Sequence, residues 1–225
     1  MFKFHLPLLL WMIAQFASAA DPLPPPSASD VAKWGKVIAA FEKADSTKMP
    51  PKNGILFIGS SSIRRWKTLS EDFPNHPVYN RGFGGSQIAD SLHFTDRIVL
   101  PYKPRQIVMF AGTNDLNVDK SPRQVLADFI AFTQRIHRHL PKTRISWIAI
   151  TPSFKRWSQI DRVRKTNRIV AEFCASDPRL DYLDTAAKML APDGKPRPDI
   201  FVSDGLHLNA KGYALWTEIV RPFLK

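Results

Sequence analysis

The chain has 225 residues, of which 44% are hydrophobic and 23% are charged, values that fit one globular domain with a substantial core. Its only cysteine is Cys174, so an internal disulfide is excluded and stability must come from the core. The formal net charge of +12 suits a nucleic-acid partner, an anionic polymer, or a solvated basic surface without any partner.

The first twenty residues have the layout of a secretory signal peptide. Lys3 gives a short basic start, residues 6–16 form an apolar run, and residues 17–20 are small. The run is short for a membrane span, which needs roughly 20 apolar residues. The sequence therefore predicts cleavage after Ala19 or Ala20 and a mature protein that is periplasmic or secreted, which argues against nucleic acid. No other stretch predicts stable membrane insertion.

After this signal peptide (1–20), the proline-rich residues 21–28 predict a stiff, extended spacer ahead of one domain at 29–225. Continuous apolar runs, typical of strands buried on both faces, follow at 55–58, 77–79, 106–111, 145–150 and 180–183. Helical patterns lie at 31–41, 121–136, 158–175 and 209–220. This alternation predicts the α/β class, as a three-layer α/β/α domain with a five-stranded parallel sheet.

A candidate nucleophile follows the first predicted strand, in Gly59-Ser60-Ser61-Ser62. The Ser61 hydroxyl is expected where the next helix begins, in the crevice at the strand ends, where free helix amides favour nearby negative charge. By itself the segment fits a helix cap equally well. We interpret Ser60 and Ser62 as capping residues rather than nucleophiles.

Asp204-Gly205-Leu206-His207 supplies a base with an orienting carboxylate. An imidazole can take the proton of a hydroxyl near neutral pH, and a carboxylate three residues earlier can reach its other nitrogen. The alternatives are a loop histidine paired with its neighbour or half of a metal site. A metal site is disfavoured because no second cluster of histidines or carboxylates has ligand spacing.

Two more segments follow the second and third predicted strands and offer oxyanion donors. Gly85 can present a backbone amide at close approach to a substrate, and Asn114 can present its carboxamide. The amide of Ser61 would be a third donor. Because parallel strands end at one edge of a sheet, these groups are expected to converge there. A tight turn without function is the alternative for the glycines alone.

Taken together, Gly59-Ser60-Ser61, Gly84-Gly85, Gly112-Thr113-Asn114 and Asp204-x-x-His207 resemble the four blocks of the SGNH (GDSL-type) hydrolase family, in particular its platelet-activating-factor-acetylhydrolase-like branch. The resemblance spans roughly residues 55–213. It implies a flavodoxin-like sheet, with Ser61 as nucleophile, Asp204 and His207 completing a triad, and Gly85 and Asn114 in the oxyanion hole. The family's first block usually reads Gly-Asp-Ser, so Ser60 in place of Asp predicts different hydrogen bonding around the nucleophile.

The sequence therefore predicts an exported serine esterase that acts on carboxylic esters, with acetyl or short acyl groups, through an acyl-enzyme and without metal or cofactor. A small-molecule or carbohydrate ester is the expected partner. The same residues would also serve an acyltransferase, and a non-catalytic ligand-binding domain of the cell envelope is a second alternative. The identity of the ester and the oligomeric state stay open.

Aromatic and cationic residues after the strand ends are expected to shape the pocket. They are Arg64, Arg65, Trp66, Phe83 and the segment 154–157. Such residues suit a sugar ring or an anionic substrate, and packing or surface roles are the alternative.

Overall fold

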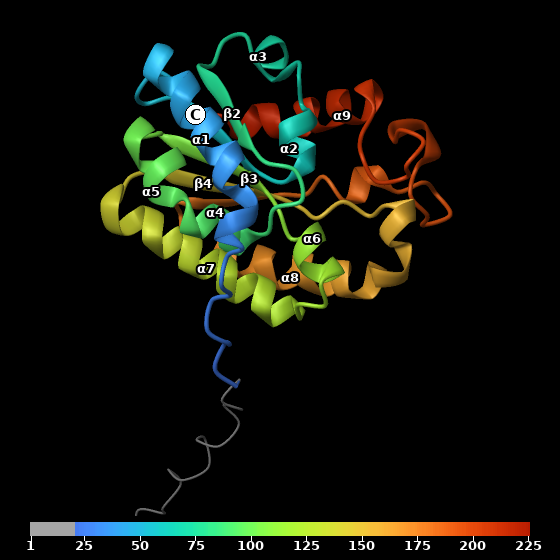
Figure 1. The fold of residues 1–225 in the computed structure, drawn as a ribbon. Helices are drawn as coiled ribbons and strands as arrows, with labels where there is room; N and C mark the ends of the chain where they lie inside the picture. Colours follow the sequence, from blue (N-terminus) through green and yellow to red (C-terminus); the bar gives the residue numbers. More distant parts are fainter. Residues whose placement is uncertain (1–20) are drawn as a thin grey trace, which may run out of the picture.

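The computed structural model describes residues 21–225, in which five parallel strands form one sheet in the order β2-β1-β3-β4-β5 (Figure 1). The strands are β1 Ile55–Gly59, β2 Val78–Gly82, β3 Gln106–Phe110, β4 Arg144–Ile148 and β5 Leu180–Leu183. Helices cover both faces of the sheet, which confirms the predicted three-layer α/β/α architecture.

The central strands supply apolar side chains to two separate cores, one on each face. Leu56 and Ile58 of β1 join one core, and Ile55 and Phe57 join the other. Side chains alternate between faces along a strand, so a strand covered on both faces is apolar on both. All five residues of β1 and of β3 are buried, which explains why these strands read as apolar runs, interrupted in β3 only by Gln106 at its start.

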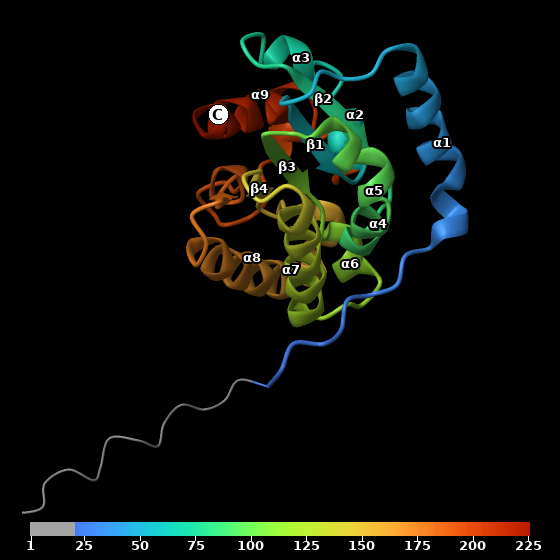
Figure 2. The same cartoon turned by 90° about the vertical axis from the view of Figure 1, so that its left-hand side faces the viewer.

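The helices divide between the two faces. The face that holds Leu56 packs against α1 Val31–Thr47, α4 Ile88–His93, α5 Thr95–Ile98, α7 Pro122–His139 and α8 Ile160–Ala175. The opposite face packs against α2 Ser61–Arg65, α3 Leu69–Asp72 and α9 Ala210–Val220. The short helix α6 Thr113–Asn117 follows β3 directly. Figure 2 shows α1 at the side of the domain, next to α5.

The structure confirms the predicted starts of two helices, and a side chain caps each of them. The Ser121 hydroxyl accepts a hydrogen bond from the Gln124 backbone N–H at 3.1 Å, and Pro122 is the first residue of α7. The Asn209 side chain accepts from the Gly212 backbone N–H at 3.1 Å and caps α9. Each cap satisfies one of the backbone donors that a helix start leaves free.

The proline-rich residues 21–28 form no helix or strand and lie along the start of α7. The Pro25 carbonyl oxygen accepts from Gln124 Nε2 at 2.7 Å, and the Ser27 backbone N–H donates to Asp128 Oδ1 at 2.6 Å. This segment therefore contacts the domain through defined hydrogen bonds. The predicted signal peptide lies outside the described residues. Within residues 21–225, no helix combines the length and apolarity that a membrane span requires.

Candidate active site

The turn after β1 places Ser61 at the carboxyl edge of the sheet. Gly59 ends the strand with a φ of +130°, and a Cβ atom there would lie 2.0 Å from the Phe110 carbonyl oxygen of β3. Only glycine fits such a position, because other residues are strained at this φ and the neighbouring backbone cannot move away. Ser61 then becomes the first residue of α2, as the sequence predicted.

A continuous chain of hydrogen bonds links Ser61, His207 and Asp204. The distance from Ser61 Oγ to His207 Nε2 is 2.8 Å, and that from His207 Nδ1 to Asp204 Oδ2 is 2.6 Å. The His207 side chain is 13% exposed and that of Asp204 is 40% exposed. This is the arrangement that a nucleophile, a base and an orienting carboxylate require. The fold brings Ser61 and His207 together although 146 residues separate them in the sequence.

The loop that carries Asp204 and His207 is held at both of its ends. Phe201 and Leu208 pair as an antiparallel bridge, and the Val202 backbone N–H donates to the His207 carbonyl at 2.9 Å. The Gly205 carbonyl accepts from the Lys155 backbone N–H at 3.0 Å, which ties the loop to the turn after β4. These contacts hold the backbone of the loop that carries His207. The two ring nitrogens of the imidazole contact Asp204 and Ser61 instead.

The Asp204 carboxylate is held in its ionised form. Partial burial by itself raises the pKa of Asp204, but hydrogen bonds from the His207 imidazole and from the backbone N–H groups of His207 and Leu206 lower it to about 2. Asp204 is therefore negatively charged throughout the neutral range, the state that favours a proton on His207 Nδ1 and leaves Nε2 free to accept one.

A further contact joins the helix that begins at Ser61 to the helix that follows His207. The Tyr213 hydroxyl of α9 donates to the Ser62 carbonyl of α2 at 2.8 Å, and Tyr213 is buried. This hydrogen bond ties α2, which begins at Ser61, to α9, which begins three residues after His207.

Gly85 and Asn114 lie where the second and third strands end, and both have donor capacity left. In the described part of the chain, no acceptor pairs with the backbone N–H of Gly85 or of Ser61. Gly85 has a φ of +88°, which glycine adopts without strain. Asn114 Nδ2 donates to the Ser86 carbonyl at 2.9 Å, and an amide nitrogen with two hydrogens keeps one for another acceptor.

A small cavity of about 20 Å³ lies beside Ser61 and Asn114. It is lined by residues from four segments, namely Ser60, Ser61, Ser62, Phe110, Thr113, Asn114, Thr151 and Leu206. A cavity needs roughly 10–15 Å³ to hold one water molecule, so this one has room for about one water-sized group. Thr151 was not predicted as part of the site. It directly follows the fourth predicted strand, and that position places it at the same edge of the sheet as Ser61 and Asn114.

Three sequence expectations for the surroundings of the site need correction. Trp66 and Phe83 were expected to shape the pocket, but they are 1% and 0% exposed and belong to the two cores. Trp66 Nε1 donates to Asp72 Oδ2 at 2.6 Å, which satisfies its only donor. Ser60 does occupy the N-cap position of α2, but its side chain makes no capping hydrogen bond. Phe154 is 46% exposed and stays a surface residue near the loop of Gly205.

Within residues 21–225, no group of three or more His, Cys, Asp or Glu side chains is arranged to hold a metal ion.

The sequence model of the GDSL-like Lipase/Acylhydrolase family matches residues 58–215, which is more than half of the chain. No curated protein matches the sequence significantly.

Solved structures with the same fold are numerous but distant in sequence. A protein from Streptococcus pneumonia, provisionally described as a platelet activating factor, has a TM-score of 0.77 and 21% identity, over 87% of this chain and 94% of that one. A GDSL-like lipase from Bacteroides thetaiotaomicron has a TM-score of 0.71 and 14% identity, over 83% and 96%. A carbohydrate esterase family 3 protein from Talaromyces cellulolyticus has a TM-score of 0.61 and 16% identity, over 75% and 94%.

At these identities the structural matches establish the fold, and the family match establishes the class of enzyme. Both confirm the resemblance that the four sequence segments indicated. The chain belongs to the GDSL-like lipase/acylhydrolase (SGNH) family and is a carboxylic ester hydrolase.

Proposed function

We propose that Ser61 is the nucleophile, His207 the general base and Asp204 the orienting carboxylate of this esterase. The observation that carries the proposal is the hydrogen-bond chain from Asp204 through His207 to Ser61, with links of 2.6 and 2.8 Å. A structural role alone gives no reason for an imidazole to bridge a carboxylate and a serine hydroxyl at the carboxyl edge of a parallel sheet.

The reaction follows from these positions. His207 Nε2 takes the proton of Ser61 Oγ as the oxygen bonds to the carbonyl carbon of the ester, and negative charge moves to the carbonyl oxygen. When the tetrahedral intermediate collapses, the bond to the alcohol breaks and His207 returns the proton to the leaving oxygen. Water then attacks the acyl-enzyme by the same route, which releases the acid and restores Ser61.

In this proposal the oxyanion is held by the backbone N–H groups of Ser61 and Gly85 and by the carboxamide of Asn114. The two backbone donors have no acceptor among the described residues, and Asn114 keeps one hydrogen after its bond to Ser86. Donors fixed in advance, and aimed at charge that develops only in the transition state, are the largest contribution to this type of catalysis.

We further propose that the acyl group is acetyl or another short chain, because the cavity beside Ser61 measures about 20 Å³. In a series of p-nitrophenyl esters, kcat/KM should fall by about 10-fold or more for each methylene beyond acetyl, since a pocket discriminates by 10- to 200-fold per methylene. Thr151→Ala, which shortens a lining side chain, should shift the preference toward propionyl. Equal kcat/KM from acetyl to hexanoyl in the wild type would contradict the proposed acyl specificity.

Export is proposed on the pattern of residues 1–20. Expression in a Gram-negative host, followed by N-terminal sequencing of the periplasmic protein, should give Ala20 or Asp21 as the first residue. Retention of Met1 on all of the protein would contradict export with cleavage. A carbohydrate ester fits an enzyme outside the cytoplasm, and the structural similarity to a carbohydrate esterase supports testing acetylated sugars first.

A further inference from the structure

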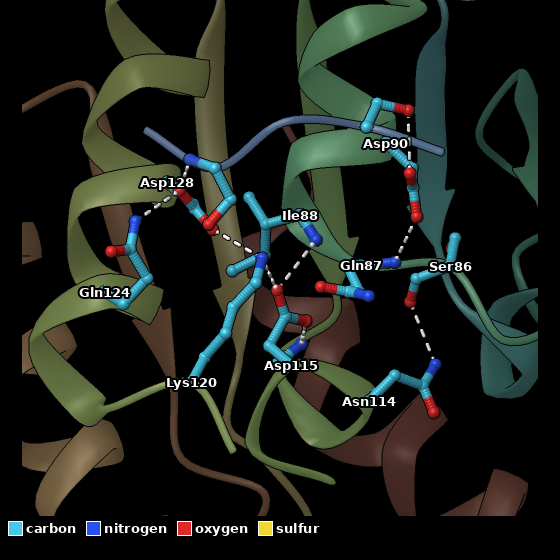
Figure 3. Close-up of polar contacts among 12 residues, drawn as sticks. Ser86, Gln87, Ile88, Asp90, Asn114, Asp115, Lys120, Gln124 and Asp128 are labelled. Carbon is cyan, nitrogen blue, oxygen red and sulfur yellow. Dashed lines mark hydrogen bonds and ion pairs between the residues drawn. The ribbon is translucent and has the colours of Figure 1, made fainter. Parts of the chain in front are cut away.

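A buried carboxylate lies directly beside the proposed oxyanion donors. Asp115 follows Asn114 in α6 and is 0% exposed. Its Oδ2 accepts from the Gly112 backbone N–H at 3.1 Å, and its Oδ1 accepts from the Ile88 backbone N–H at 3.2 Å (Figure 3). One side chain thus joins the segment that follows β3 to the start of α4, which follows the segment that carries Gly85.

The same two segments are joined a second time through Asn114. Its Nδ2 donates to the Ser86 carbonyl, and the Ser86 hydroxyl donates to the Gly59 carbonyl at 3.1 Å. Gly59 lies two residues before Ser61. The three strand-end segments that carry the three proposed oxyanion donors are therefore connected by side-chain bonds, and Asp115 is the ionisable group among them.

The ammonium of Lys120 places a positive charge beside the buried carboxylate of Asp115. Its Nζ lies 3.1 Å from Asp115 Oδ1 and 2.8 Å from Oδ2 of Asp128, a second carboxylate that is 0% exposed. The pKa of Asp115 is raised overall, because burial and the nearby Asp128 carboxylate raise it by more than the ammonium of Lys120 and the N–H of Ile88 lower it. Without the ammonium, two buried carboxylates would face each other, an arrangement in which at least one of them takes up a proton.

The outer side of this network is closed by the segment before α1. Asp128 Oδ1 accepts from the Ser27 backbone N–H at 2.6 Å and from Gln124 Nε2 at 3.0 Å. Asp90 accepts from the Ser29 hydroxyl at 2.7 Å and from the Gln87 backbone N–H at 2.8 Å, one residue after Ser86. Asp90 thus links the segment before α1 directly to Gln87, whereas Asp128 is linked to Asp115 through Lys120 (Figure 3).

We propose that Asp115 and Lys120 are positioning residues of the oxyanion hole: the Asp115 carboxylate sets the spacing between the Gly85 and Asn114 donors, and the Lys120 ammonium holds that carboxylate in place. This inference rests on the proposed function of the site. Neither residue touches the substrate. Their effect is geometric, since a shift of about 1 Å in a catalytic group can reduce a rate by about 100-fold.

The test compares Lys120→Met and Asp115→Asn with the wild type. Lys120→Met keeps the length of the side chain and removes its charge, and Asp115→Asn replaces one acceptor oxygen by a donor. For each, kcat on an acetyl ester is measured per active site, as counted by titration with a fluorophosphonate, at a temperature well below the unfolding midpoint. We expect kcat to fall by about 10- to 100-fold while KM changes by less than about threefold.

Asp181→Asn is the control, because Asp181 pairs with Arg144 at 2.7 Å in a partly buried site near the amino ends of β4 and β5. It should lower the unfolding midpoint and leave kcat within about twofold of the wild type, since β4 and β5 direct their other ends to the site. If Lys120→Met lowers only the unfolding midpoint and kcat per titrated site is unchanged, the positioning role is wrong, even if Asp115→Asn fails to fold. Full activity in Ser61→Ala would instead overturn the proposed function itself.

Discussion

Ser61→Ala is expected to reduce turnover of an acetyl ester by at least ~10³-fold, and by up to ~10⁶-fold, as in other enzymes whose triad loses its nucleophile. The reason is chemical rather than structural. The Ser61 oxygen lies 2.8 Å from His207 Nε2, and without that oxygen no acyl-enzyme can form. Steady-state hydrolysis of p-nitrophenyl acetate measures the effect, and thermal unfolding of the same preparation shows that the variant is folded.

Ser60 and Ser62 provide the controls for this experiment, because they flank the proposed nucleophile in the sequence. Neither hydroxyl contacts His207 among the described residues, so Ser60→Ala and Ser62→Ala should each keep at least about a tenth of the turnover. A ranking in which Ser60→Ala or Ser62→Ala is the inactive variant would move the nucleophile to that position and contradict the proposed role of Ser61.

Asn114→Ala should lower kcat by about 10²- to 10³-fold with little change in KM, the effect of removing one oxyanion donor. The carboxamide is expected to bind the carbonyl oxygen more strongly once that oxygen carries charge. Its removal should therefore raise the free energy of the transition state and leave the affinity for the substrate nearly unchanged. Measuring kcat and KM separately on the acetyl ester tests this expectation.

Asn117→Ala is the matched control for Asn114, since Asn117 lies on the same short helix and is exposed to solvent. Its kcat and KM should stay close to those of the wild type. An Asn114→Ala enzyme with normal kcat and a raised KM would mean that the residue binds the ground state, and Asn114 would then have no role in the oxyanion hole.

The central strands were readable from the sequence because both of their faces are covered. β1 and β3 are apolar at nearly every position, the pattern of strands covered on both faces. The edge strand β2 was predicted only as residues 77–79, whereas it runs to Gly82 through Asn80 and Arg81. Arg81 is buried and paired with Asp45 of α1 and with Tyr102. A sequence pattern cannot show that a charged residue will find such partners.

The candidate groups of the site were predictable from the sequence, but the residues that hold them in position were not. Four segments predicted the candidate groups because each follows a strand or precedes a helix at one edge of the sheet. The direction of a side chain at that edge is set by packing, which is why Trp66 and Phe83 turn into the cores rather than toward the pocket. Asp115 contacts Ile88 and Lys120 as well as its near neighbour Gly112, and no spacing rule brings Ile88 and Lys120 to this carboxylate.

The covalent reaction of the folded protein with a fluorophosphonate tests the proposed chemistry most directly. Intact mass and peptide mapping should show one adduct per chain, carried by Ser61. The adduct should be absent from Ser61→Ala and strongly slowed in His207→Ala, because the reagent needs a serine whose proton can be removed. An actively hydrolysing preparation that takes up no label, or a label that persists in Ser61→Ala, would show that this hydroxyl is not the nucleophile.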